Sequence, residues 1–88
     1  MAYRFYTSSD FDKQFRKLDP SVQRIIHKWI MTHLIDTDDP RSFGKPLTGS
    51  LKGYWHYSIG SWRLLVRIDD DELILIAVDI DHRSTVYR

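Results

Sequence analysis

The sequence predicts an α+β fold with the order β-α-α-β-β-β, in which two helices pack on one face of a small, largely antiparallel sheet. Three observations support this prediction. Aromatic and polar residues alternate at the start, two stretches with apolar residues at helical spacing follow, and three apolar runs divided by short turns fill the second half. A chain of 88 residues builds one hydrophobic core, so we expect residues 1–88 to form a single domain.

The first strand is expected over residues 2–7, with Tyr3, Phe5 and Thr7 on one face. Ser8 or Ser9 then offers a side-chain oxygen to the free N–H groups at the start of a helix. The apolar side of this short helix consists of Phe11, Phe15 and Leu18.

A second, longer helix is expected to begin at Asp19 and Pro20, because proline at the first helical position lacks only an N–H that has no partner there. Its apolar stripe consists of Val22, Ile25, Ile26, Trp29, Ile30 and Leu34. Turn-forming residues follow, and residues 36–52 are expected to form an ordered loop. The two helices together need a sheet to cover their apolar sides.

Three strands, residues 53–59, 62–68 and 73–80, are expected to form an antiparallel meander. Gly60 and Ser61 suit a two-residue turn whose first position requires a positive φ. This turn sets a register in which one face is almost wholly apolar, with the pairs Ile59–Trp62, Tyr57–Leu64 and Trp55–Val66.

The opposite face of the same strands carries polar side chains. Ser58 is expected directly opposite Arg63, with His56 one diagonal step away and Tyr54 further along the strand. An arginine on a strand is usually an ordinary surface residue, but these neighbours make Arg63 a candidate for phosphate binding.

The turn before the last strand decides whether His82 joins this face. An acidic turn of even length predicts the pair Ile68–Leu73. Asp79 would then point toward the core, which indicates that the last strand bends or bulges near its end. Three residues of that strand are expected on the side of Arg63: Val78, Ile80 and His82. The guanidinium and both imidazoles therefore converge in this prediction.

The composition excludes several classes of function. Cysteine is absent, so disulfides, thiol catalysis and the commonest zinc ligand are ruled out. The start of the chain has no apolar signal segment, and the longest apolar run, residues 73–78, is too short to span a bilayer, so we expect a cytoplasmic protein without a membrane partner. The net charge is only +1, so any contact with nucleic acid must come from local clustering.

The remaining polar residues have ordinary structural explanations. His27 and His33 on the long helix are assigned to structure or solvent, and Arg67 to the surface. The acidic run at residues 69–72 lacks the spacing of a calcium loop, so we predict neither a metal nor a cofactor. Tyr87 near the end of the chain is equally consistent with an aromatic plug for the core.

Three segments in combination resemble the signature of the RelE/ParE toxin superfamily, on its RelE-like mRNA-interferase side: residues 45–49, 51–63 and 81–88. The order of elements is also similar over nearly the whole chain. This resemblance implies a toxin of a type II toxin–antitoxin system that a cognate antitoxin inhibits. It further implies entry into the ribosomal A site, contact with rRNA and cleavage of the mRNA there. Operator DNA would be reached only through the antitoxin.

Cleavage of this kind needs no cofactor, because the ribose 2′-OH attacks the neighbouring phosphorus. The resemblance implies that Arg63 holds the phosphate while His56 and His82 transfer protons. It places Arg83 as a further catalytic cation and Tyr87 as an aromatic that stacks on a base or moves a proton. The expected substrate-binding residues are Lys45, Lys52, Tyr54, Ser58 and Arg88.

Two departures from the family pattern leave alternatives open. Ser58 stands where relatives commonly carry Arg or Lys, and Asp81 adds negative charge near the expected phosphate site. One alternative is a ParE-like toxin that poisons DNA gyrase by binding, without nuclease chemistry. The other is a catalytically weakened toxin that acts mainly through antitoxin binding.

Overall fold

The computed structural model describes residues 1–47 and 53–82. The elements are β1 (Arg4–Thr7), α1 (Ser9–Arg16), α2 (Pro20–His33), the 3-10 turn η1 (Pro40–Ser42), β2 (Lys45–Pro46), β3 (Tyr54–Ile59), β4 (Trp62–Asp69) and β5 (Ile74–His82). The expected α+β class is confirmed, with η1 and β2 as additions inside the segment that the sequence predicted as a loop.

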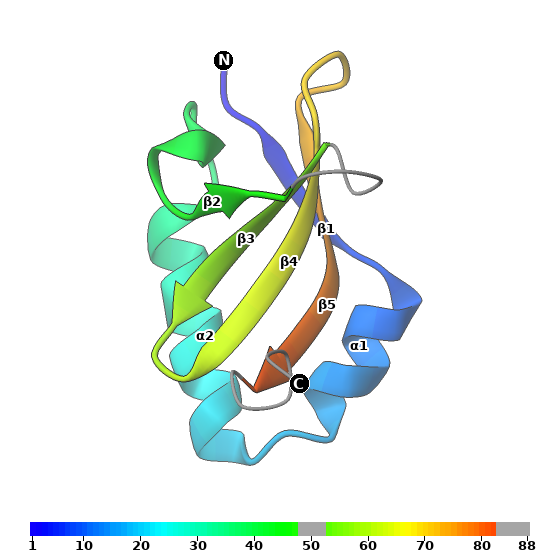
Figure 1. The fold of residues 1–88 in the computed structure, drawn as a ribbon, viewed down its shortest axis with the longest axis vertical. Coiled ribbons are helices and arrows are strands. Elements are labelled where there is room, and N and C mark those ends of the chain that lie inside the picture. Colours follow the sequence, from blue (N-terminus) through cyan, green and yellow to red (C-terminus); the bar gives the residue numbers. More distant parts are fainter. Residues whose placement is uncertain (48–52, 83–88) are drawn as a thin grey trace.

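The strands form one five-stranded sheet with the order β1-β5-β4-β3-β2. β1 pairs with β5 in parallel, and all other pairs are antiparallel. Figure 1 shows α2 behind β3 and β4, and α1 alongside β5. Within the described residues, neither helix has the length and apolar character needed to cross a bilayer.

The helices begin where the sequence predicts. The Ser8 side-chain oxygen accepts a hydrogen bond from the Phe11 N–H at 3.1 Å and so caps α1, while Pro20 opens α2. Ile26 and Ile30 are buried in the core, but Ile25 is 57% exposed, so its expected place in the stripe is wrong. The stripe is wider than the helix face that the sheet covers.

The β3–β4 hairpin has the predicted register. Tyr57 pairs with Leu64 and Ile59 with Trp62, and Gly60 adopts the positive φ of 59° that its turn requires. The buried side chains of this hairpin join those of both helices and β5 in one cluster. Its members include Phe11, Ile26, Ile30, Leu34, Tyr57, Ile59, Leu64, Val66, Leu75, Ala77 and Ile80.

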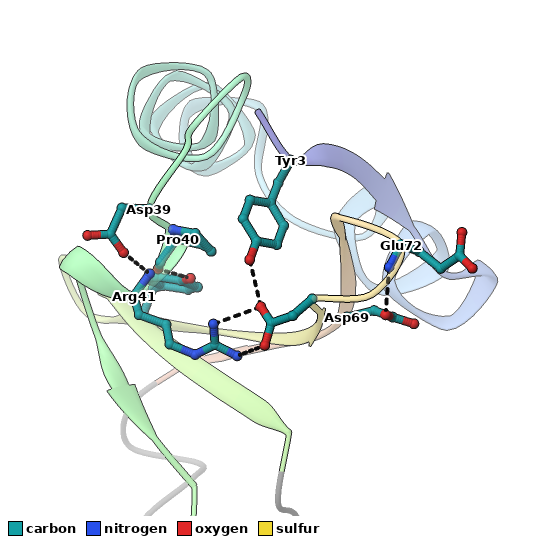
Figure 2. Close-up of polar contacts among 8 residues, drawn as sticks. Tyr3, Asp39, Pro40, Arg41, Asp69 and Glu72 are labelled. Carbon is teal, nitrogen blue, oxygen red and sulfur yellow. Dashed lines mark hydrogen bonds and ion pairs between the residues drawn. The ribbon is translucent and has the colours of Figure 1, made fainter. Parts of the chain in front are cut away.

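The predicted pairing of the β4–β5 hairpin is wrong by two residues. Ile68 pairs with Leu75 rather than Leu73, because the turn occupies residues 70–73. The Asp69 carboxylate accepts a hydrogen bond from the Glu72 N–H at 3.1 Å, as Figure 2 shows. Leu73 completes the turn with a φ of 55°, in the left-handed region that a leucine seldom adopts.

A bulge in β5 then reverses the sheet face on which each of the following side chains lies. Leu65 pairs with Asp79 but Val66 pairs with Ala77, so one residue is inserted between them. The predicted bend or bulge near the strand end is thus confirmed. The expected positions of Val78 and Ile80 beside Arg63 are wrong. Ile80 is buried in the core, and the partner of Arg63 is Asp81.

The segment between α2 and β3 is fixed at several points. Arg41 donates two hydrogen bonds to the Asp70 carboxylate, at 2.9 and 3.0 Å, and the Tyr3 hydroxyl donates a third at 2.6 Å (Figure 2). The buried Tyr57 hydroxyl donates to the Pro40 carbonyl at 2.6 Å. Hydrogen bonds from Arg41 and then Tyr3 lower the pKa of Asp70. The acidic turn therefore connects three parts of the chain.

Candidate functional site

Arg63 and His56 form the centre of the polar sheet face. One terminal guanidinium nitrogen of Arg63 lies 2.7 Å from Nδ1 of His56 and 3.2 Å from its Nε2. A guanidinium only donates hydrogen bonds, so the imidazole nitrogen that it contacts must be the acceptor and the ring is neutral. Burial lowers the pKa of His56, and the positive charges of Arg63 and Lys45 lower it further.

Lys45 lies beside this centre because β2 pairs with β3 at close range. It pairs with His56 across the two strands. Gly44, with a φ of 72°, precedes it, and a Cβ there would overlap the carbonyl oxygen of His56. The indole N–H of Trp55 donates to the Phe43 carbonyl at 2.6 Å and holds the same segment. The backbone itself thus brings a lysine beside the Arg63–His56 pair.

The other two described candidates on β3 lie on the same face at different distances from the centre. Ser58 pairs with Arg63, as the sequence predicts, and its side chain is exposed. Tyr54 pairs with Arg67 at the far end of the hairpin. Ser58 is therefore next to the guanidinium, whereas Tyr54 is separated from it by His56 along the strand.

His82 does not lie on the side of Arg63, which corrects the expected convergence of two imidazoles. It pairs with Trp62, one position away from Arg63, and its ring meets the Trp62 ring edge to face at 5.2 Å. Neighbouring strand residues point to opposite faces, so the bulge that turned Ile80 inward also turned His82 away. Asp81 takes the place that His82 was expected to fill.

Two carboxyl groups that the sequence did not single out as functional lie beside Arg63. Asp79 and Asp81 line a cavity of about 120 Å³ together with His56 and Arg63. The Asp79 carboxylate is positioned by the Gln14 side chain, which donates to it at 2.6 Å. A hydrogen bond with Asp79, then burial, raises the pKa of Asp81 to about 6. Asp81 therefore keeps its proton to a higher pH than an ordinary aspartic acid does.

A second, larger cavity lies on the β2 side of the same centre. Its volume is about 510 Å³, and Lys45, His56, Ser58 and Arg63 line it from the strands. Its other wall consists of aromatic rings from α2 and the following segment: Trp29, His33 and Phe43. The sequence assigned His33 to structure or solvent, although its spacing of four residues from Trp29 on a helix could have indicated a shared ring surface.

Four of the expected site residues fall outside the described residues: Lys52, Arg83, Tyr87 and Arg88. The roles that the family resemblance implies for them remain predictions. The described part of the site therefore consists of Lys45, Tyr54, His56, Ser58 and Arg63, with the carboxyl pair Asp79 and Asp81 added and His82 on the other face.

Comparison with known proteins identifies relatives over almost the full length. Residues 6–87 match the family model described as the ParE toxin of the type II toxin–antitoxin system parDE. Toxin RelG of Mycobacterium tuberculosis is 33% identical over 85 residues, which cover 97% of this chain and 93% of the relative.

Solved structures show the same fold. In the RelBE2 toxin–antitoxin complex from Mycobacterium tuberculosis, a chain with 28% identity superposes with a TM-score of 0.83, covering 94% of this chain and all of that one (100%). The isolated RelE toxin of E. coli gives a TM-score of 0.74 at 19% identity, with coverage of 98% and 92%.

Proposed function

The chain belongs to the RelE/ParE superfamily as a toxin of a type II toxin–antitoxin system, and we propose from this that it is a ribosome-dependent endoribonuclease acting on mRNA in the A site. The observation that carries the proposal is the direct contact between Arg63 and a neutral His56 on an open sheet face, with Lys45 alongside. A cognate antitoxin is the proposed inhibitory partner, since relatives with this fold have been solved as RelB–RelE complexes.

In this proposal, binding of the scissile phosphate frees His56 to act as the general base. A phosphodiester attracts the Arg63 guanidinium through charge-assisted hydrogen bonds that are stronger than its present bond to a neutral imidazole. The released His56 nitrogen then has a free lone pair with which to accept the 2′-OH proton. Its lowered pKa keeps the ring unprotonated at neutral pH, as a base requires.

Asp81 is the proposed proton donor for the leaving 5′ oxygen. It lies directly opposite Arg63 and lines the same cavity as His56. An approaching phosphate adds negative charge and favours its protonated form further. The 2′ oxygen forms a bond to phosphorus as the bond to the 5′ oxygen breaks. His56 takes one proton and Asp81 gives one, which leaves a 2′,3′-cyclic phosphate and a 5′-OH.

The decisive experiment uses purified protein and programmed ribosomes, with primer extension to locate cuts. Arg63→Ala removes the donor to the phosphate and should slow cleavage roughly 10²- to 10³-fold, as the loss of one oxyanion donor does. Arg67→Ala is the matched control, because it removes an exposed arginine from the same strand and face. Cleavage by Arg63→Ala at the wild-type rate would rule out this site.

The family model that matches the chain favours one other function, because its description is that of a ParE toxin. A ParE-like protein would poison DNA gyrase by binding and would leave mRNA intact. Gyrase supercoiling assays with the same preparation separate the two functions. Inhibited supercoiling together with uncut mRNA on programmed ribosomes would replace the nuclease proposal with this one.

A further inference from the structure

The aromatic side of the cavity of about 510 Å³, formed by Trp29, His33 and Phe43, has no role in the cleavage steps described above. The residues that line the cavity belong to α2, the segment that leads into β2, β3 and β4. Figure 1 shows α2 behind β3 and β4. The cavity has a volume within the range of roughly 300–1,000 Å³ that is typical of sites for small organic ligands. It begins beside Arg63, so a ligand held there would be adjacent to the phosphate at that arginine.

One wall of this cavity is a set of aromatic rings in mutual contact. The Trp29 and His33 rings stack with centroids 4.4 Å apart, and the Phe43 ring meets His33 edge to face at 4.7 Å. The His33 ring is fixed, because its Nδ1–H donates to the Trp29 carbonyl at 2.9 Å. Phe43 is nevertheless 43% exposed, which is unusual for a large apolar side chain held in such a cluster.

The backbone around Phe43 is fixed in advance. Its carbonyl accepts the Trp55 indole N–H at 2.6 Å, and the following Gly44 packs against the His56 carbonyl too closely for any Cβ. A ring surface that is ordered before binding loses little conformational entropy when a ligand stacks on it. The exposed aromatic surface is therefore already ordered before a ligand binds.

The other wall of the cavity is cationic. Lys45 and Arg63 line it, and His56 and Ser58 add polar groups between them. An apolar helix or a lipid chain would bury these two charges against apolar surface, which costs free energy. A nucleotide satisfies both walls, because its base offers a flat π surface and its phosphate offers negative charge.

We propose that this cavity binds one nucleobase of the RNA, next to the phosphate held by Arg63, against the ring wall formed by Trp29, His33 and Phe43. The inference rests on the proposed function only in taking RNA as the ligand. Stacking on aromatic rings tolerates every base, so the cavity contributes affinity and position more than sequence choice.

The test compares oligonucleotides that differ only in a base. A trinucleotide with 2′-O-methyl riboses cannot be cleaved by 2′-OH attack, and abasic versions at each position carry the same phosphate charge. Calorimetric titration of the full chain should show one position at which loss of the base weakens binding roughly 5- to 150-fold, the effect of one lost stacking contact. Equal affinity for the intact and all abasic trinucleotides would overturn the inference.

Variants assign the effect to the ring wall. Phe43→Ala should abolish the difference between intact and abasic ligands while leaving abasic binding unchanged, and Phe43→Trp should restore it. Tyr6→Ala is the matched control, because Tyr6 is 47% exposed on β1 at the opposite edge of the sheet. A base-dependent difference that persists in folded Phe43→Ala, checked by circular dichroism, would equally overturn the inference.

The outcomes also separate this inference from the nuclease proposal. Base-dependent binding that requires Phe43, without cleavage on programmed ribosomes, would support the base site and reject the nuclease. Ribosomal cleavage combined with equal affinity for intact and abasic ligands would reject the base site alone.

Discussion

The two hairpins of the sheet differ in how strongly their turns determine their registers. In the β3–β4 hairpin, Gly60 occupies a turn position with a φ of 59°, and the strands pair as the sequence predicts. In the β4–β5 hairpin, the turn contains no glycine and ends on Leu73 with a φ of 55°, and the predicted pairing is wrong. A turn residue with a strict steric requirement fixes a register, whereas a run of acids permits several.

This difference determines which residues reach the site. The first hairpin delivers His56, Ser58 and Arg63 to one face as expected. The second hairpin shifts by two residues and then bulges, so Asp81 lies opposite Arg63 and His82 lies opposite Trp62.

The largest effect is expected from substitutions at Asp81 and His82, because the bulge places Asp81 rather than His82 on the sheet face of Arg63. Asp81→Asn removes a proton donor and should slow ribosomal cleavage by roughly 10²-fold or more, within the range for general acids. His82→Gln should change the rate far less, because His82 lies on the other sheet face against Trp62. Cleavage rates on programmed ribosomes measure both. A large loss in His82→Gln with normal cleavage by Asp81→Asn would contradict the proposed assignment.

The fold class and the first hairpin were predictable because they rest on local rules. Apolar residues at helical spacing define α1 and α2, Ser8 and Pro20 mark their starts, and Gly60 marks a tight turn. Ile25 shows the limit of such patterns, since helical spacing alone does not say how wide the covered face is. The bulge in β5 depends on tertiary contacts.

The contacts that position the end of β5 are remote in sequence. The Gln14 side chain on α1 accepts a hydrogen bond from the Ile80 N–H at 3.0 Å and donates one to the Asp79 carboxylate. These two bonds hold the end of β5, which extends past Ala77, the last β5 residue that pairs with β1. No local pattern near Asp79 announces a partner 65 positions away. The ring wall of Trp29, His33 and Phe43 likewise depends on how the segment after α2 folds back.

A substitution at the first turn tests its steric requirement directly. Gly60→Ala places a Cβ on a residue with a φ of 59° and should lower the free energy of unfolding by about 1–2 kcal/mol. The cause is backbone strain, because no atom of the residues that the structure describes, other than the chain neighbours of Gly60, lies within 4 Å of the new Cβ. Urea unfolding measures the loss. Gly60→Asn, which tolerates this conformation better, should recover part of it, and an unchanged stability in Gly60→Ala would contradict the argument.

The carboxyl pair at the second hairpin predicts a pH-dependent stability. The pKa of Asp81 is raised to about 6 in the folded protein, against about 3.9 in an unfolded chain. Folding therefore opposes ionisation of Asp81: the penalty is absent below about pH 4, grows as the pH rises to 6, and is complete above it. Asp81→Asn should remove a penalty on the order of 1 kcal/mol at pH 7.5, after allowance for partial solvent exposure.

Thermal unfolding at pH 7.5 and below pH 4 measures this effect. The gain in Asp81→Asn should be present at the higher pH and vanish at the lower one. Asp71→Asn makes the same change in net charge at an exposed position of the turn and is the control. An equal gain in both variants at pH 7.5 would attribute the effect to overall charge rather than to the pair of Asp79 and Asp81.

The smallest effect is expected at the contacts that hold the second turn. Arg41→Met removes two hydrogen bonds to Asp70 and the stacking of the guanidinium over the Trp55 ring at 5.7 Å. Both partners are exposed, so the loss should be about 0.5–1 kcal/mol and should shrink at high salt. Because the pKa of Asp70 is lowered in the folded protein, these contacts stabilise the fold at neutral pH. The stabilisation is lost as acid protonates Asp70.

Hydrogen exchange can locate this loss within the sheet. Arg41→Met should accelerate exchange at the turn of residues 70–73, which Asp70 ties to Arg41 and Tyr3, and should leave the Gly60 turn unchanged. Arg24→Met, at an exposed position on α2, is the matched control. Equal acceleration at both turns would mean that the two hairpins open together, so that the registers of β3–β4 and β4–β5 are held by one cooperative unit rather than by their separate turns.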